Sequence, residues 1–423
     1  MPTRKTTGRA RRARSHFRTR SSVGLALAGG GPLGGIYEIG ALLALADSLE
    51  GLDVNDLDVY VGVSSGSFVA AALANHISPA QMYRLFIDDR ADTALTPELF
   101  LRPALAEFRR RAGTLPRLAL RAALQYLRDP WRNGLMASFS TLSRAVPTGM
   151  FDNAAIDDFL ARLFAAHGRT NDFRQLSHQL FLVATNLDTG ASVTFGGAGH
   201  DQVPISRAIA ASAALPGLFP PVRIAGEYYV DGALNKTLHA SVALDEGVEL
   251  LICINPLVPY DGSNTSADEH LTVRKLDHGG LPIVLSQTFR AIIHSRMKVG
   301  MEKYRQQYPD ADVVLFEPDR EDADMFFANI FSYAHRKRLC AAAFRKTREN
   351  LVMRAPQLAP ILARHGIALD SARLADSTRQ VTDALVDPRP LHAQAGEPLS
   401  VRAAAKDLDN ALALLEGWVA ARR

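Results

Sequence analysis

Two strand–turn–helix units follow one another near the start of the chain, and they constrain the fold more than any other feature of the sequence. Residues 23–28 form a short apolar run, residues 29–35 are rich in glycine, and residues 36–49 carry apolar side chains at helical spacing. A second apolar run at residues 58–63 leads through a Ser-Ser-Gly turn into an alanine-rich helix over residues 67–75. This alternation predicts an α/β fold, a mainly parallel sheet with helices on both faces.

The rest of the chain adds strands to this sheet and helices around it. Further strands are predicted at residues 179–186, 192–195, 227–231, 250–255 and 312–316. A helical insertion is predicted at about residues 79–178, and residues 321–423 are predicted to form a helical C-terminal region. The chain has 423 residues, 47% of them hydrophobic, which is enough to form one large α/β domain over residues 21–320.

Charge is distributed unevenly along the chain. Residues 1–20 hold eight Lys and Arg side chains and no acidic one, so residues 21–423 carry a net charge of −4 although the whole chain carries +4. We expect residues 1–20 to form a disordered basic arm, with attachment to anionic lipid as the alternative. A basic amphipathic stretch at residues 98–132 is expected to pack as a surface helix pair, with contact to a lipid interface as its alternative. Nucleic acid is not expected as a partner.

Composition and targeting signals limit the class of protein. The apolar run at residues 23–28 is shorter than the ~7–15 residues of an export signal. Extending the run brings in several glycines, Pro32 and Glu38, which do not suit a membrane-spanning helix. We therefore expect a cytoplasmic protein with peripheral membrane contact. Only two cysteines are present, Cys253 and Cys340, which excludes a disulfide-stapled scaffold and a multi-cysteine metal cluster.

Residues 62–66 contain the pattern of a nucleophile elbow. They read Gly-Val-Ser-Ser-Gly, which fits G-x-S-x-G, and they lie between a predicted strand and a predicted helix. The two glycines allow the chain to turn sharply enough to present the hydroxyl of Ser64 at the end of the strand. The following helix directs its free N–H groups and the positive end of its dipole toward charge that develops near that hydroxyl. Ser64 is therefore the candidate nucleophile.

The glycine-rich turn has two interpretations. Residues 29–34 fit G-x-G-x-x-G, the fingerprint of a dinucleotide site, but that site needs an acidic residue at the end of the next strand. This chain has Ser64 at that place. In the second interpretation the backbone N–H groups of Gly29, Gly30 and Gly31 form an oxyanion hole. A nucleotide-dependent oxidoreductase is thus the less favoured function.

A serine nucleophile needs a base, and Asp231 is one candidate. It ends a strand-like run and precedes Gly232, so that a turn can aim its carboxylate, although on sequence alone an Asp-Gly turn without chemistry is the commoner case. A Ser–His–Asp triad through His76, His200 or His239 is the alternative. The sequence contains no H-E-x-x-H, no paired cysteines and no calcium loop, so no metal and no other cofactor is expected.

Five ordered blocks of this sequence resemble the patatin-like phospholipase family, whose members use a Ser–Asp dyad and a glycine-rich oxyanion loop. The resemblance covers about residues 23–255 and implies the family's α/β fold. The blocks are residues 29–34, 62–66, 184–190, 208–221 and 231–233.

The resemblance implies a lipid acyl hydrolase that forms an acyl-enzyme on Ser64, with Asp231 as its base and the glycine-loop amides as oxyanion donors. The implied substrate is a phospholipid or another acyl lipid. The family usually has Arg or Lys where this chain has Leu33, so the help that such a cation gives to an oxyanion or a phosphate head group is missing. A lipid- or partner-binding protein with little turnover is the alternative that this departure leaves open.

Overall fold

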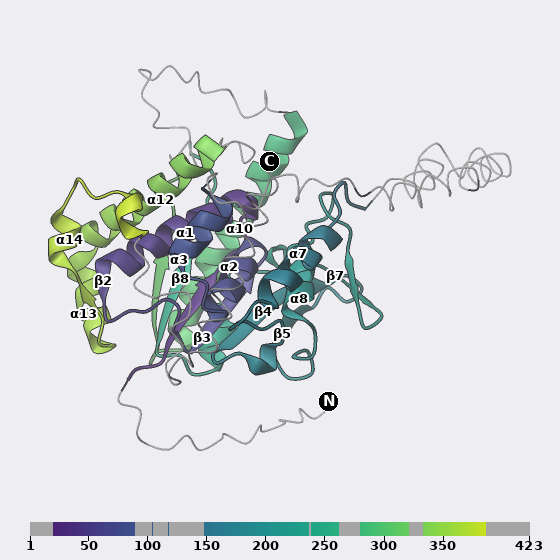
Figure 1. Ribbon diagram of the computed structural model, residues 1–423, viewed down its shortest axis with the longest axis horizontal. Coiled ribbons are helices and arrows are strands. Elements are labelled where there is room, and N and C mark those ends of the chain that lie inside the picture. Colours follow the sequence, from purple (N-terminus) through teal and green to yellow (C-terminus); the bar gives the residue numbers. More distant parts are fainter. Residues whose placement is uncertain are drawn as a thin grey trace, which may run out of the picture. The chain divides into compact units, whose positions relative to one another are not determined.

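A mostly parallel sheet of eight strands forms the centre of the described structure (Figure 1). The strands are β1 (Val23–Leu27), β3 (Val59–Val63), β4 (Gln179–Asn186), β5 (Ser192–Phe195), β6 (Val222–Ile224), β7 (Glu227–Asp231), β8 (Leu250–Ile254) and β9 (Asp312–Phe316). Their hydrogen-bonded order is β6-β7-β4-β3-β1-β8-β9, with β5 also paired to β4. The pairs among β4, β3, β1, β8 and β9 are parallel, whereas β5, β7 and β6 join through antiparallel pairs. The predicted α/β fold is confirmed.

The structure is a computed structural model, and it describes only part of the chain. The described residues are 20–88, 104, 117, 148–236, 238–261, 280–320 and 333–385. The predicted basic arm, apart from Arg20, lies outside them, and so do nearly all of the amphipathic stretch at residues 98–132 and everything after residue 385. The domain boundaries and the helical insertion drawn from the sequence therefore stay predictions.

Helices cover both faces of the sheet. One face packs against α1 (Gly31–Ser48), α2 (Ser65–Ala74), α3 (Pro79–Phe86), α8 (Ile205–Ser212) and α12 (Tyr333–Met353), and the other against α9 (Ser241–Asp245) and α10 (Gly280–Gln307). Along β1, Leu25 and Leu27 belong to the first core and Ala26 to the second, as the alternation of side chains in a strand requires. Burial on both faces explains why these strands appear in the sequence as unbroken apolar runs.

The first helix begins earlier than the sequence predicts. The prediction starts it at residue 36, but α1 begins at Gly31 and includes much of the glycine-rich segment. Pro32 stands in the first turn, where its fixed φ is compatible with a helix and its missing N–H costs nothing. The amide of Gly34 already donates to the carbonyl oxygen of Gly30 at 3.0 Å. The glycines therefore form a helix start, which leaves the first amides of α1 without intrahelical acceptors.

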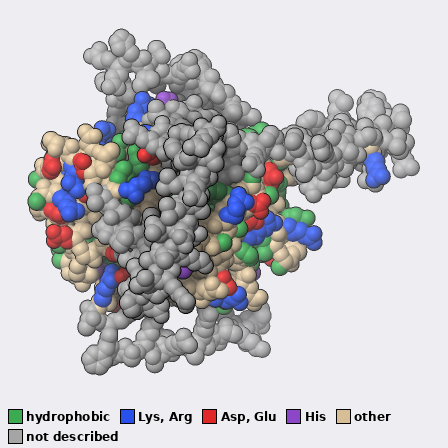
Figure 2. Space-filling view, viewed as in Figure 1, with side chains coloured by type: hydrophobic (Ala, Val, Ile, Leu, Met, Phe, Trp, Pro, Cys, Tyr) green, Lys and Arg blue, Asp and Glu red, His purple; other side chains and the backbone are tan. Residues whose placement is uncertain are grey.

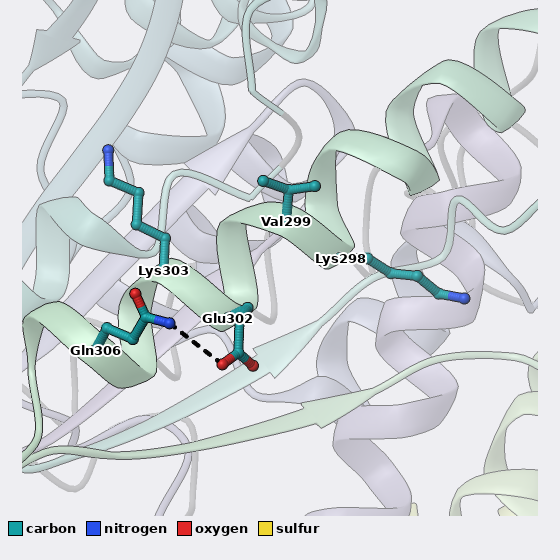
Figure 3. Close-up of a pocket in the computed structure, with 5 residues that line it drawn as sticks. All are labelled: Lys298, Val299, Glu302, Lys303 and Gln306. Atoms are coloured by element: carbon teal, nitrogen blue, oxygen red, sulfur yellow. Dashed lines mark hydrogen bonds between the residues drawn. The ribbon is translucent and has the colours of Figure 1, made fainter.

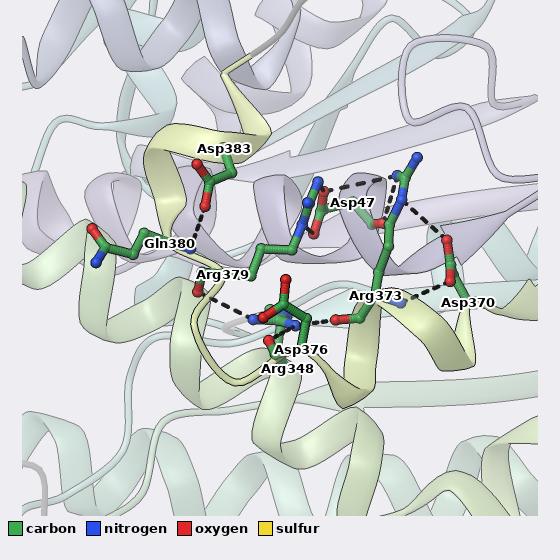
Figure 4. A network of polar contacts seen from close by, with 8 residues as sticks. All are labelled: Asp47, Arg348, Asp370, Arg373, Asp376, Arg379, Gln380 and Asp383. Atoms are coloured by element: carbon green, nitrogen blue, oxygen red, sulfur yellow. Dashed lines mark hydrogen bonds and ion pairs between the residues drawn. The ribbon is translucent and has the colours of Figure 1, made fainter.

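The last described part of the chain is fixed to α1 by a polar network (Figure 4). Its centre is the buried carboxylate of Asp47, which accepts hydrogen bonds of 2.7 and 2.5 Å from the guanidinium of Arg379. Arg373 donates to the backbone oxygen of Asp47 at 2.9 Å, and Arg348 of α12 donates to the backbone oxygen of Arg379 at 3.2 Å. Other elements of this region are α13 (Ala355–Arg364), α14 (Ser371–Ala375) and a short antiparallel pair of β2 (Leu49–Glu50) with β10 (Ala368–Leu369).

Candidate active site

The two predicted catalytic residues come from strands that meet end to end along one edge of β4. Leu182 of β4 pairs with both β3 and β5, and Ala184 pairs with both β5 and β7. Because a strand has only two edges, β5 occupies one of them, and β3 and β7 occupy the other in succession. β3 ends directly before Ser64, and the oppositely directed β7 ends at Asp231. The register of the sheet thus brings these two residues together.

Ser64 and Asp231 form a buried hydrogen-bonded pair. The hydroxyl of Ser64 donates to Oδ2 of Asp231 at 2.7 Å across 167 residues of sequence. The other carboxylate oxygen, Oδ1, accepts the backbone N–H of Ala233 at 2.8 Å. The exposed fraction is 7% for Ser64 and 2% for Asp231. Burial raises the pKa of Asp231 to about 6, against the opposing effect of the hydrogen bonds from Ser64 and Ala233.

Ser64 has the strained backbone of a nucleophile elbow, with φ 53° and ψ −122°. Two residues before it and two residues after it, the backbone is packed too closely to leave room for a side chain. A methyl group on Gly62 would lie 2.4 Å from Cα of Ser67, and one on Gly66 would lie 2.6 Å from the carbonyl oxygen of Leu27. Both glycines of the motif are therefore required by close backbone contacts.

Ser212 of α8 anchors the elbow, and the sequence did not single it out. Its hydroxyl accepts the backbone N–H of Ser64 at 2.9 Å and donates to the carbonyl oxygen of Val183 at 2.6 Å. The side chain is fully buried. It lies in one of the segments that resemble the family, but a serine within an alanine-rich helix carries no local signal of such a role.

The glycine loop lies directly beside the Ser–Asp pair. A methyl group on Gly29 would lie 2.9 Å from Cβ of Ser64 and 3.1 Å from Cβ of Ala233. Gly30 precedes α1, and Gly31 begins it with φ +60°. Both α1 and α2 thus begin next to Ser64, and the N-terminal ends of two helices favour negative charge at this place.

Leu33 occupies the position where the family usually has a cation. Its partly buried side chain packs against the larger hydrophobic core. The electrostatic field at the site must therefore come from backbone N–H groups and helix ends rather than from a charge at this position.

Two of the three histidines considered for a triad, His76 and His200, make contacts away from the Ser–Asp pair. Nε2 of His76 lies 3.3 Å from the hydroxyl of Ser177, and the ring of His200 packs edge-on against Phe195. His239 is buried, which lowers its pKa to about 4, and its side chain makes a hydrogen bond with the backbone of Gly232, the residue after Asp231. None of these contacts involves Ser64 or Asp231.

A serine–histidine–aspartate chain is present at the opposite end of the sheet. Oγ of Ser21 lies 2.7 Å from Nδ1 of His365, whose Nε2 lies 2.8 Å from a carboxylate oxygen of Asp312. The single hydroxyl proton of Ser21 points to the carboxylate of Glu249 rather than to the imidazole. Arg364 also donates to Asp312. This arrangement connects the segments before β1 and β8, and the first residue of β9, to the end of α13, which is a structural role.

Three other kinds of functional feature were considered among the described residues: a surface hollow, a metal site and a membrane-spanning helix. A hollow on α10 is lined by five residues of that helix alone, Lys298, Val299, Glu302, Lys303 and Gln306 (Figure 3), and is an open helix face. Within the described ranges no group of three or more His, Cys, Asp or Glu side chains is placed to hold a metal ion. No helix among the described residues combines the length and apolarity needed to cross a membrane.

Comparison with known proteins agrees with the resemblance seen in the motifs. The family model described as patatin-like phospholipase matches residues 25–244, more than half of the chain, and this range contains both Ser64 and Asp231. The chain belongs to the patatin-like phospholipase family. Membership supports lipid hydrolysis as the class of activity, and the match includes the glycine loop that had also suggested a dinucleotide site.

Several solved structures are similar at low sequence identity. VipD from Legionella pneumophila has 15% identity over 79% of this chain and 67% of that chain, with a TM-score of 0.35. The type III effector ExoU of Pseudomonas aeruginosa has 16% identity over 86% and 61%, with a TM-score of 0.34. Human GIVD cytosolic phospholipase A2 has 12% identity over 80% and 59%, with a TM-score of 0.29. The present chain thus spans about two thirds of these proteins or less.

The raised pKa of Asp231 predicts an unusual dependence of stability on pH. The folded protein holds the proton up to about pH 6, whereas the unfolded chain releases it near pH 4, so stability falls as the pH rises between these values. The loss is up to about 3 kcal/mol. Asp231→Asn removes it, so the variant should gain unfolding free energy relative to wild type between pH 4 and pH 8, as measured by urea denaturation. The exposed Asp188→Asn is the control, and a pH-independent difference for Asp231→Asn would contradict the prediction.

Proposed function

We propose that this protein hydrolyses a carboxylic ester of a phospholipid or another acyl lipid, with Ser64 as nucleophile and Asp231 as base. The observation that carries the proposal is the buried 2.7 Å hydrogen bond from the Ser64 hydroxyl to the Asp231 carboxylate, next to two helix N-termini. Membership in the patatin-like phospholipase family supports the lipid substrate. A binding protein of the same fold with little turnover is the alternative.

The proposed reaction has two halves. Asp231 takes the proton of Ser64 as the serine oxygen attacks the ester carbonyl carbon, and the resulting oxyanion accepts hydrogen bonds from the N–H groups of the glycine loop. The tetrahedral intermediate collapses to an acyl-enzyme, and Asp231 returns the proton to the departing alcohol. Asp231 then takes a proton from water as the water attacks the acyl-enzyme, and the acid leaves as Ser64 recovers its proton.

A single carboxylate can serve as this base because of its environment. An ordinary aspartate is too weakly basic to accept a serine proton efficiently, and a catalytic pKa near the working pH is more effective. The pKa of Asp231 is raised toward that range by burial. No histidine is needed in the proposed mechanism.

Exposed apolar side chains on segments that are hydrogen-bonded to β7 or to one another support a lipid substrate. We call them the apolar rim: Met150, Leu187, Leu215, Leu218, Tyr228 and Leu234, each 36–51% exposed. Backbone hydrogen bonds connect their segments, from Phe151 to Leu218 and from Leu187 to Tyr228. The carbonyl oxygen of Ala214, directly before Leu215, accepts the backbone N–H of Asp231.

Basic side chains accompany the apolar rim. The guanidinium carbon of Arg223 lies 6.0 Å from the centre of the Tyr228 ring, and Lys236 is exposed close to Leu234 in the sequence. Figure 2 shows hydrophobic side chains next to Lys and Arg side chains, with Asp and Glu side chains among them, over the part of the molecule that carries β7. A surface that combines single apolar anchors with cations fits an interface of anionic lipid. We propose that the protein binds a membrane surface peripherally through this rim.

The first prediction concerns turnover. Wild-type protein incubated with mixed phospholipid vesicles should release free fatty acid and lysophospholipid, detected by mass spectrometry, and Ser64→Ala should release none. A fluorophosphonate should label the wild type at Ser64. The matched control is Ser67→Ala, which lies in the same turn but donates only to the Ser64 carbonyl oxygen. Product release by Ser64→Ala would exclude this serine as the nucleophile.

The second prediction concerns pH. Because Asp231 must be ionised to accept the proton and its pKa is about 6, kcat/KM for a soluble ester should rise from pH 5 and level off above pH 7. At pH 5 the rate should be about tenfold below the plateau, since one pH unit below a pKa leaves about a tenth of the groups ionised. Replacing His76 or His200 should leave the midpoint unchanged. A midpoint below pH 4.5 would contradict the role of burial.

The third prediction separates lipid contact from chemistry. Leu218→Asp places a charge on the apolar rim, so it should lower vesicle binding and hydrolysis of vesicle lipid by about tenfold. Hydrolysis of a short-chain soluble ester should stay within about twofold of wild type. Val299→Asp, at a 71% exposed position of α10, is the control and should change neither. Equal losses on vesicles for both variants would contradict the assignment of the surface.

A further inference from the structure

The glycine loop is supported from behind by the segment that follows β8. Ala28, the last residue before the loop, donates its backbone N–H to the carbonyl oxygen of Ile254 at 3.0 Å. A methyl group on Gly30 would lie 2.6 Å from Cγ of Pro256, and one on Gly34 would lie 3.0 Å from the same atom. The buried ring of Pro256 is therefore in close contact with the loop on the side away from Ser64.

The position of Pro256 is set by the side chain of Asn255. Asn255 is fully buried, and its Oδ1 accepts the backbone N–H of Leu257 at 3.1 Å while its Nδ2 donates to the carbonyl oxygen of Leu257 at 3.3 Å. The side chain thus closes a tight turn around Pro256. The backbone N–H of Asn255 donates to the carbonyl oxygen of Phe316 at the end of β9.

Asn255 is in turn oriented by Glu317. Ile254 and Phe316 are paired and are the last residues of the parallel strands β8 and β9. The residues that follow them, Asn255 and Glu317, therefore lie side by side at the carboxyl ends of these strands. Nδ2 of Asn255 donates to Oε1 of Glu317 at 2.7 Å. Nδ1 of His294 lies 3.9 Å from the same oxygen. The Glu317 side chain is only 25% exposed.

Helix α10 fixes the other end of the segment. Gln287 donates to the carbonyl oxygen of Tyr260 at 2.7 Å and accepts the backbone N–H of Tyr260 at 3.1 Å. Arg290 donates to the carbonyl oxygen of Val258 at 3.3 Å. The segment of residues 255–260 is thus held at both ends, and its Pro256 ring is in close contact with the glycine loop.

We propose that Asn255 and Glu317 are positioning residues for the oxyanion hole. They act through Pro256, which holds the glycine loop at the distance from Ser64 that its N–H groups need to reach the oxyanion. Donors in such a site act at about 2.7–3.1 Å from the developing charge, and a displacement of about 1 Å is enough to cost about 100-fold in rate. The proposal rests on the proposed hydrolase function.

The test compares variants that remove the support with one that keeps it. Asn255→Ala removes the hydrogen bonds that orient Pro256, and Pro256→Ala removes the ring that contacts the loop. Both should lower kcat for a soluble ester by about 10- to 100-fold while KM changes less than threefold. Glu317→Gln keeps an oxygen acceptor for Asn255 and should stay within about threefold of wild type, whereas Glu317→Leu should behave like Asn255→Ala.

A control and a second readout separate positioning from stability. Asn55 is a buried asparagine that donates to the carbonyl oxygens of Leu73 and Ile77, away from the glycine loop. Asn55→Ala should lower the melting temperature but not kcat of the folded protein. A trifluoromethyl ketone, whose tetrahedral adduct carries an oxyanion, should bind Asn255→Ala more weakly by the same factor as kcat falls. The midpoint of the pH profile should not move.

The outcomes distinguish this proposal from the proposed function. If Asn255→Ala keeps kcat and inhibitor affinity within twofold of wild type, or loses no more kcat than Asn55→Ala, the positioning role is wrong. If wild-type protein hydrolyses no ester at all, the proposed function fails instead. The rate of fluorophosphonate labelling at Ser64 then tests the positioning role, because the phosphoryl oxygen of that reagent occupies the same hole. Unchanged labelling of Asn255→Ala would overturn it.

Discussion

The candidate active site depends on the shared edge of β4. Because β3 and β7 pair in succession with that edge and run in opposite directions, the hydroxyl that follows one strand meets the carboxylate that ends the other. Backbone hydrogen bonds of the sheet set this approach, so Ser64 and Asp231 are held at the ends of two paired strands. A site on such a scaffold is preorganised, which is what proton transfer over a single hydrogen bond requires.

This placement has an energetic cost that the surrounding structure offsets. The left-handed backbone of Ser64 stores about 1–3 kcal/mol of strain, and the buried carboxylate of Asp231 loses its hydration. Ser212 holds the elbow by bonding to Ser64 itself and to Val183 of β4, and the tight contacts of Gly62 and Gly66 leave the chain no alternative path. The strain therefore persists because the neighbouring strands and helices determine the geometry from several sides.

Local signals explain which parts the sequence could predict. The bounds of β4, β5, β7 and β9 agree with the predicted ones, because each is an apolar or alternating run between turn residues. β6 was not predicted, since three residues that include the exposed Arg223 form no pattern. Ser64 could be singled out because glycines mark its turn, and Asp231 because the Asp-Gly-Ala block resembles the family. Ser212 could not, because its partners Ser64 and Val183 are brought close only by the fold. Asn255 could not either, because its bond to Glu317 depends on the pairing of β8 with β9.

The electrostatics of the site depend on backbone dipoles more than on side-chain charge. Leu33 places an apolar side chain where the family usually has a cation, and in the proposed mechanism Asp231 becomes neutral when it takes the proton of Ser64. Neither side chain therefore gives a positive charge to the oxyanion that would form. In that mechanism the oxyanion depends on fixed N–H groups at the starts of α1 and α2, and such donors lose their effect steeply with distance. The proposed activity is therefore sensitive to the position of the glycine loop. This sensitivity explains why the loop would need a buried support from the segments that follow β8 and β9.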